Sequence, residues 1–272
     1  MKSILLHVDG DQCFEARKQV ALDLARAGNG HITCLQAVSY EVFAPGDFYG
    51  NAMAAAMPRI KEAAEELRAK VEADLSNEGA SFEWRFCYGM AETHLLEQSA
   101  LHDVIVIGPH DIGEDGSRGP SAMAGELAIK APAPVLVVPG EVKSFDPSDP
   151  VMVAWNGSSE ACIAMRRALP LLAQSKNVFL ASVAEPGERT RYEFPVSEAA
   201  MYLDRHDVST EVVEIPKGKE SVADALSRAA QVRNCSSLVI GAYGHSRLAE
   251  LLMGGVTRSV LTDPALPVLM AH

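Results

Sequence analysis

The chain contains an internal repeat, and no other feature of the sequence constrains its fold as strongly. Residues 103–108 read Asp-Val-Ile-Val-Ile-Gly and residues 236–241 read Ser-Ser-Leu-Val-Ile-Gly, and in each copy a Pro-Val-Leu sequence begins 26 positions after the glycine. The openings of the two copies, residues 4–10 and 151–157, also correspond. Self-similarity at a spacing of about half the chain indicates a duplicated domain.

The length agrees with two domains, because 272 residues exceed the roughly 150 that form one compact unit. The sequence from Gly140 to Pro150 is polar and contains proline, as linkers commonly do. We therefore expect one domain over residues 1–140 and a second over residues 150–272.

Each copy alternates short apolar runs with stretches of helical period. The expected strands are residues 4–8, 31–38, 82–86, 104–107 and 135–138, then 151–155, 178–183, 210–215, 238–240 and 268–270. The expected helices are residues 13–27, 60–75, 92–100 and one before Lys130, then 160–172, 197–206, 221–233 and 248–261. Apolar strands that alternate with helices indicate a parallel sheet covered on both faces. The predicted fold class is α/β, with two doubly wound parallel-sheet domains.

The charge of the chain narrows the classes of partner. Lys and Arg number 24 against 36 Asp and Glu, a net charge of −12, which would repel a nucleic acid backbone and an anionic membrane. The apolar runs are far shorter than the roughly 20 residues that cross a bilayer, and the first residues do not resemble a signal peptide. We expect a cytoplasmic protein with no nucleic acid or membrane as its partner.

The cysteines and histidines do not predict a metal site. The five cysteines form no Cys-x-x-Cys pair, and we expect them to be reduced and mostly buried. The eight histidines do not have a metal-ligand spacing such as His-x-x-x-His. We predict no metal ligand and no catalytic residue.

A glycine-rich segment follows the apolar strand at residues 238–240. Gly241 and Gly244 would let backbone N–H groups approach a ligand closely, and Gly254-Gly255 would open a helix whose N-terminus favours an anion. The remaining candidates supply a backbone or hydroxyl donor, or a positive or potentially positive group: Val256, Thr257, Arg247, Arg258 and His245. The pattern suits a phosphate, although a tight turn also needs glycine and His245 could equally be a solvated surface group.

The first copy lacks this pattern. At the corresponding positions Gly244 is replaced by Asp111, Gly254 by Ser121, Gly255 by Ala122 and Thr257 by Ala124. Asp111 would place a negative charge where a phosphate should lie. The fold therefore does not require these glycines, which favours a ligand role for them in the second copy.

These residues resemble a known family. Gly241-x-x-Gly244, followed nine residues later by Gly254-Gly255-Val256-Thr257, is similar to the signature G-2x-G-9x-G-(S/T) of the universal stress proteins, and the resemblance covers nearly the full chain as a tandem member. It implies an adenine-nucleotide alpha-hydrolase-like fold in each half and ATP as the ligand. It also implies which residues would contact ATP: the glycines, Val256 and Thr257 at the phosphates, Ala154, Trp155 and Asn156 at the ribose, and Val183 at the adenine.

Two positions depart from the family pattern. Gly255 stands where the signature has Ser or Thr, and Asn156 stands where Asp is usual. Each change removes a contact worth about 1 kcal/mol, so we expect weakened nucleotide affinity. In the first half the reverse holds, because Asp9 is in place and the phosphate glycines are absent.

The resemblance implies a regulatory protein that binds one adenine nucleotide, ATP with or without Mg²⁺, in the second half, with little or no turnover. Two alternatives stay open: an interaction protein whose sites have decayed in both halves and which binds no cofactor, and a slow ATPase. The sequence does not contain the Gly-Lys-Ser/Thr of fast phosphoryl transfer. The protein partners are unknown.

The resemblance further implies that the halves pack about a pseudo-two-fold axis as an intramolecular dimer, and the chain could pair again as a homodimer. The closing strands, residues 135–138 and 268–270, would lie at that contact or inside each domain's own sheet.

Other polar and aromatic residues have plain explanations. Ser158 and Ser159 fit helix caps, and Asp9 with Asp11 fits a solvated loop without calcium. Residues 41–57 could form a lid, a partner surface or a loop over their own domain.

Overall fold

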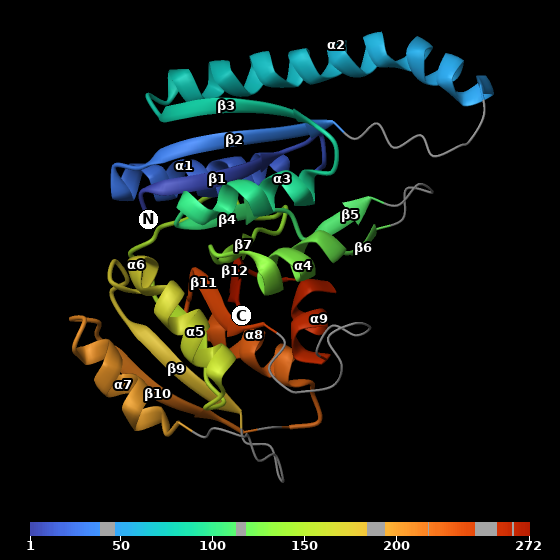
Figure 1. Cartoon of the computed structure of the whole chain (residues 1–272). Helices are drawn as coiled ribbons and strands as arrows, with labels where there is room; N and C mark the ends of the chain where they lie inside the picture. Colours follow the sequence, from blue (N-terminus) through green and yellow to red (C-terminus); the bar gives the residue numbers. More distant parts are fainter. Residues whose placement is uncertain (39–46, 113–117, 184–193, 217, 243–254, 263) are drawn as a thin grey trace.

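The computed structural model describes residues 1–38, 47–112, 118–183, 194–216, 218–242, 255–262 and 264–272. Ten strands form one sheet in the order β10-β9-β8-β11-β12-β7-β4-β1-β2-β3 (Figure 1). These strands are β1 Ser3–Val8, β2 His31–Val38, β3 Ser81–Tyr88, β4 Val104–Ile107, β7 Val135–Val137, β8 Val151–Ala154, β9 Val178–Val183, β10 Thr210–Ile215, β11 Ser237–Gly241 and β12 Val268–Ala271. Each corresponds to a strand expected from the sequence, which confirms the α/β class.

Helices cover the sheet on both faces. They are α1 Phe14–Gly28, α2 Asp47–Asn77, α3 Ala91–Gln98, α4 Ala122–Lys130, α5 Ser159–Arg167, α6 Leu169–Leu172, α7 Val196–Asp204, α8 Val222–Val232 and α9 Gly255–Thr262, with a short 3-10 turn at Ser99–Leu101. One apolar core includes residues of α1, α2, α5 and α7, and the other includes residues of α3, α4, α8 and α9. Each core contains residues from both halves of the chain, so the two halves share their interior.

The two halves meet at an antiparallel strand pair. The strand order of the first half, β3-β2-β1-β4-β7, is the mirror of β10-β9-β8-β11-β12 in the second. Strand β7 pairs with β4 in parallel and with β12 antiparallel, with Leu136 opposite Leu269. All three residues of β7 and all four of β12 are buried. The sequence left open whether these strands lie at the contact between the halves or inside their own sheets. In the structure each strand pairs with its own half on one side and with the other half on the other side.

Left-handed residues end several helices and turn the chain into the next strand. Asn29 after α1 (φ 46°), Asp207 after α7 (φ 58°) and Asn234 after α8 (φ 52°) are the non-glycine residues with positive φ among those described. Gly79 does the same after α2, with φ 66°. Asparagine, aspartate and glycine tolerate this conformation best, so these four positions explain where the helices stop.

The structure differs from the expectations at several elements. Residues 47–57, expected in a loop, form the first turns of α2, while residues 41–46 of that stretch lie outside the described residues. The expected helix 160–172 breaks at Ala168, because Pro170 fits the first turn of a new helix and not the interior of the old one. A hairpin of β5 His110–Ile112 and β6 Arg118–Pro120 was not predicted.

The cysteines are all free thiols, as expected, but they are less buried than predicted. Cys34 alone among the five is buried, and the other four are half-buried. Burial raises the pKa of Cys34 to about 12 and that of Cys235 to about 11, so both thiols stay protonated at neutral pH.

Candidate functional site

The predicted ligand residues of the second half gather at one edge of the sheet. Strand β8 lies between β9 and β11, and all three run parallel. Asn156 follows β8, Val183 ends β9 and Gly241 ends β11, so their backbones meet at the carboxyl edge. The chain moves from β8 outward to β9 and then returns to β11 on the other side of β8. This reversal of strand order is where ligands bind in open α/β sheets.

The turn after β8 is held by local hydrogen bonds. The exposed Asn156 accepts a hydrogen bond through Oδ1 from the backbone N–H of Ser158, at 3.1 Å. Gly157 takes a φ of 78°, a conformation that favours glycine. Ser158 Oγ then accepts from the backbone N–H of Ala161 at 3.2 Å, so Ser158 caps α5 as predicted. The turn presents the Asn156 side chain at the protein surface.

Trp155 has a structural part in this turn. Its side chain is buried, and its indole Nε1 donates to the backbone oxygen of Phe194 at 3.1 Å. Its backbone N–H donates to Ala181 of β9 at 2.7 Å. Ala154, beside it, is half-buried at the end of β8. The indole has one N–H donor, which is used within the protein, so the Trp155 side chain connects the two loops and has no free N–H for a ligand.

Gly241 is required by packing. A Cβ at this position would lie 2.6 Å from the carbonyl carbon of Glu160 and 2.7 Å from the backbone nitrogen of Ala161. Helix α5 therefore approaches the end of β11 more closely than any side chain would allow. The structural role that the sequence left open for Gly241 is the one that the coordinates support.

Helix α9 begins at Gly255, inside the predicted glycine pattern. Thr257 lies in its first turn and is buried, with 4% of its surface exposed. The backbone of Gly255 and Val256 belongs to the same turn. Gly244, His245, Arg247 and Gly254 lie outside the described residues, as does the side chain of Arg258. Their ligand roles stay predictions.

The corresponding helix of the first half has a side-chain cap. Ser121 precedes α4, and its Oγ accepts a hydrogen bond from the backbone N–H of Ala124 at 3.0 Å. Ser121 corresponds in sequence to Gly254, and Ala124 corresponds to Thr257. In the first half a serine side chain thus satisfies a backbone donor at the helix N-terminus, whereas the corresponding residue of the second half is Gly254, which has no side-chain oxygen.

The interpretation of Asp9 and Asp11 as a solvated loop is wrong. Arg17 of α1, whose side chain is fully buried, pairs with both carboxylates. The sequence pattern places position 17 inside a helix with an apolar face, and an arginine there was the signal that we missed. Asp9 is therefore in place, as predicted, but it is bound by the protein itself.

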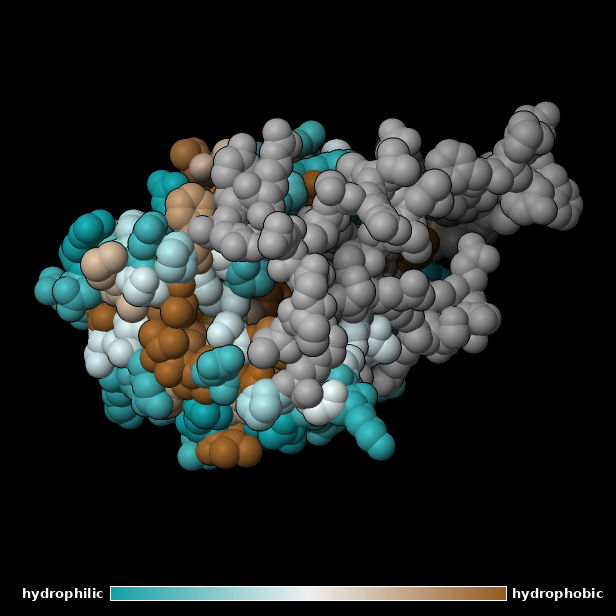
Figure 2. Space-filling view, turned by 90° about the horizontal axis from the view of Figure 1, so that it is seen from below, coloured by the Kyte–Doolittle hydropathy of each residue, from teal (hydrophilic) through white to brown (hydrophobic). Residues whose placement is uncertain are grey.

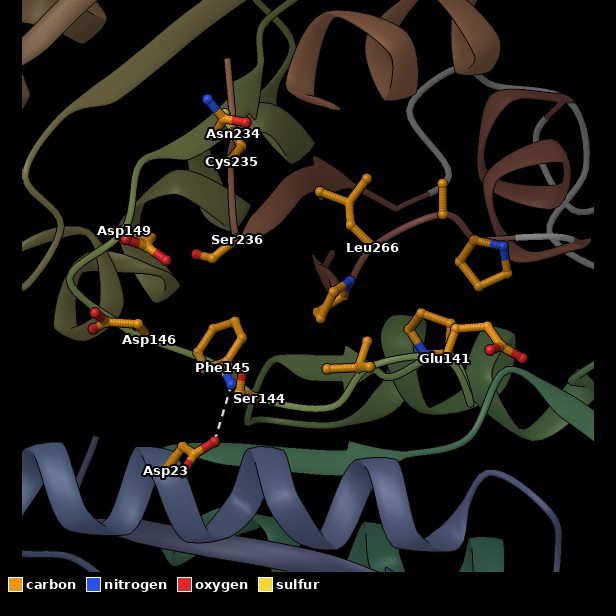
Figure 3. Close-up of a pocket in the computed structure, with 15 residues that line it drawn as sticks. Asp23, Glu141, Ser144, Phe145, Asp146, Asp149, Asn234, Cys235, Ser236 and Leu266 are labelled. Atoms are coloured by element: carbon orange, nitrogen blue, oxygen red, sulfur yellow. Dashed lines mark hydrogen bonds between the residues drawn. The ribbon is translucent and has the colours of Figure 1, made fainter. Parts of the chain in front are cut away.

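A pocket of about 630 Å³ lies elsewhere, between the linker and the loops before β11 and β12 (Figure 3). Its lining includes none of the predicted ligand residues. Four carboxylates line it, from Asp23, Glu141, Asp146 and Asp149, and no lysine, arginine or histidine is among its lining residues. Asp23 also accepts a hydrogen bond from the backbone N–H of Phe145 at 2.9 Å, which ties the linker to α1. This acidic pocket would repel a phosphate, so we do not place the nucleotide there.

No group of three or more His, Cys, Asp and Glu side chains is placed to hold a metal ion within the described part of the chain. No described helix is long and apolar enough to span a membrane.

Seen from below, apolar residues gather beside polar ones on the surface (Figure 2). Large exposed apolar residues of the second half include Phe194, Met201, Val212 and Val232.

Known proteins resemble the second half of the chain in sequence and the whole chain in structure. A family model described as the universal stress protein family matches residues 147–272. The structure is similar to a universal stress protein from Archaeoglobus fulgidus DSM 4304, with a TM-score of 0.72 and 17% identity over 99% of this chain and 96% of that one. It is also similar to a chain from Pseudomonas aeruginosa UCBPP-PA14 assigned to the universal stress proteins, with a TM-score of 0.55 and 18% identity over 99% and 92%.

At these identities the structural likenesses establish the fold, and they cover both halves of the chain. A search of curated proteins finds no match. The family model adds the sequence evidence for the second half. Residues 147–272 thus match the universal stress protein family in sequence, and the whole chain shares its fold with solved universal stress proteins.

Proposed function

We propose that the chain is a regulatory protein that binds one adenine nucleotide, ATP with or without Mg²⁺, in its C-terminal half, with little or no turnover. The phosphates would bind at the N-terminus of α9, and the ribose would bind beside Asn156. The adenine would contact the backbone near Val183. The family match of residues 147–272 and the position of these residues at the reversal of strand order support the proposal.

The observation that carries the proposal is the difference between α4 and α9. Ser121 Oγ satisfies the N–H of Ala124 in the first half. Glycine at position 254 has no side-chain oxygen that could do the same for the N–H of Thr257. Backbone N–H groups at a helix N-terminus, together with the helix dipole, form an anion site when no side chain caps them.

The affinity should be modest. Asn156 is neutral, and its Oδ1 already accepts from Ser158, so a ribose hydroxyl would find an amide in place of the usual carboxylate. Losing the charge-assisted bond costs about 1 kcal/mol, close to a fivefold weaker binding constant.

Calorimetric titration of nucleotide-free protein with ATP and Mg²⁺ tests the proposal. We expect about one site per chain, because the first half has neither the glycine pattern nor an uncapped helix. About two sites would mean that the first half also binds. No detectable binding would contradict the proposal and favour an interaction protein that has kept the fold.

A matched pair of variants tests the position of the phosphates. Gly254→Ser, which copies Ser121, should cap α9 and lower ATP affinity by about tenfold or more, because a hydrogen bond to a charged group is worth about 1.5–3 kcal/mol. The control Ser121→Gly should leave ATP affinity unchanged. Equal affinity in wild type and Gly254→Ser would contradict the assignment of the phosphates to α9.

The absence of turnover needs its own control. Gly244→Asp, which copies Asp111, should abolish ATP binding without unfolding the protein. Phosphate release by wild type at the rate of this variant would agree with a binding protein. A higher rate in wild type would instead support the slow ATPase.

A further inference from the structure

The first half contains a buried ion cluster at the end of β1. The Arg17 guanidinium donates through Nε to the backbone oxygen of His7 at 2.9 Å and through Nη1 to both carboxylate oxygens of Asp11 at 2.8 Å. Its Nη2 donates to Asp9 Oδ1. The Arg17 side chain is 0% exposed, against 11% for Asp11 and 37% for Asp9. All three guanidinium nitrogens therefore have partners.

Oxygen Oδ1 of Asp9 accepts hydrogen bonds within this cluster. Besides Arg17, its Oδ1 accepts from the backbone N–H of Asp11 at 3.0 Å. Its other oxygen, Oδ2, lies 3.4 Å from His7 Nδ1. A ribose hydroxyl that approached Asp9 would have to compete with a guanidinium already in contact with it.

The cluster lies at the reversal of strand order in the first half. Strand β1 lies between β2 and β4, as β8 lies between β9 and β11. A Cβ at Gly108, directly after β4, would lie 2.8 Å from Arg17 Nη1 and 3.0 Å from Asp11 Oδ2. The guanidinium thus bridges the ends of β1 and β4, the two strands between which a ligand of this fold would bind.

The described residues of the second half contain no such cluster. The internal repeat aligns Asp9 with Asn156, Asp11 with Ser158 and Arg17 with Ala164. The short turn is the same in both, since Asn156 Oδ1 accepts from Ser158 N–H as Asp9 Oδ1 accepts from Asp11 N–H. Ala164 is buried and cannot reach the turn with a polar group. The residue at this buried helix position, Arg17 or Ala164, therefore decides whether the turn is paired with a guanidinium.

We infer that the residue at this helix position selects which half of the chain takes the nucleotide. Arg17 binds the ribose-side carboxylate of the first half and closes it to a ligand, whereas Ala164 leaves the turn of the second half available. The inference rests on the proposed function. It adds a cause for the single site that is independent of the phosphate loop, because Arg17 acts at the ribose end of the cleft.

Transfer of the cluster into the second half tests the inference. Asn156→Asp alone supplies the carboxylate and should bind ATP at least as tightly as wild type. The triple variant Asn156→Asp, Ser158→Asp and Ala164→Arg supplies the same carboxylate together with its guanidinium. We expect it to bind ATP about tenfold or more weakly than Asn156→Asp.

The outcomes of this titration separate the inference from the proposed function. Equal ATP affinity in the triple variant and in Asn156→Asp would overturn the inference and leave the proposed function in place. A wild type and an Asn156→Asp variant that both fail to bind ATP would overturn both. Circular dichroism of each variant establishes that it is folded.

Urea unfolding of the first half provides a second test if the triple variant does not fold. Arg17→Ala leaves two carboxylates without their cation and should lower the urea midpoint. The neutral set that copies the second half, Asp9→Asn with Asp11→Ser and Arg17→Ala, should recover much of that loss. An Arg17→Ala variant that unfolds at the wild-type midpoint would overturn the inference, because the guanidinium would then hold neither carboxylate.

Discussion

Gly241→Ala should destabilise the protein in the absence of any ligand. The φ of Gly241 is not in the left-handed region, so alanine can adopt its backbone conformation, and the cost comes from contact alone. The new Cβ would lie 2.6 Å from the Glu160 carbonyl carbon, where ordinary contacts begin near 3.4 Å, so α5 must move by about 0.8 Å. Overpacking of this kind costs about 1–3 kcal/mol.

Urea unfolding followed by tryptophan fluorescence measures this cost. The chain has two tryptophans, Trp84 in the first half and Trp155 in the second, so a Trp84→Phe background reports on the second half. With a urea slope of about 2 kcal/mol/M, the midpoint should fall by about 0.5–1.5 M. Gly10→Ala is the control, because a Cβ there meets nothing within 4 Å.

Two results would refute this reasoning. If Gly241→Ala unfolds at the same urea concentration as Gly10→Ala, the close approach of α5 to β11 does not constrain this position. If Gly241→Ala also loses ATP binding while keeping its stability, Gly241 acts on the ligand and not on the packing of α5.

Three further predictions concern stability. Ser158→Ala removes the cap on the Ala161 N–H and should lower the free energy of unfolding by about 1 kcal/mol in urea titrations. Burial alone would raise the pKa of Asp9, but Arg17, His7 and the backbone N–H of Asp11 outweigh burial and hold that pKa below its ordinary value. The stability difference between wild type and Asp9→Asn should therefore be constant above about pH 5 and disappear as the pH falls through the pKa of Asp9 in the folded protein. Urea midpoints of both proteins from about pH 3 to 7 measure this difference. Leu269→Ala, at the β7–β12 contact, should cost about 2–5 kcal/mol, and a thermal midpoint equal to wild type would contradict its burial.

The sequence predicted the ten central strands because each is an apolar run between turn residues, and the repeat allowed one half to check the other. It did not predict the β5–β6 hairpin, since residues 110–120 include glycines and charges that do not alternate in the pattern of strands. The start of α2 was also missed, because the helix was expected from residue 60 and it begins at Asp47 and continues through Pro58. The domain boundaries at residues 140 and 150 remain predictions.

The candidate site was predicted in part. Asn156, Val183 and Gly241 meet at the sheet edge because parallel strands bring their carboxyl ends together, which is a property of the topology. The Arg17 cluster could not be read from spacing, since its partners lie six and eight residues away and face the same buried space only after α1 packs on β1. Packing, not local pattern, decided that part of the site.

The antiparallel pairing of β7 with β12 has a consequence for how such a chain can change. If the two halves were separate chains, the fraction paired through this contact would depend on their concentration in solution. The linker from Gly140 to Pro150 instead holds them at an effective concentration on the order of millimolar. Their pairing is then intramolecular and does not depend on ligand occupancy in both members. Under our proposal, Arg17 can therefore occupy the place of a ligand in the first half without loss of the pairing between the halves. The first half still extends the sheet of the second half.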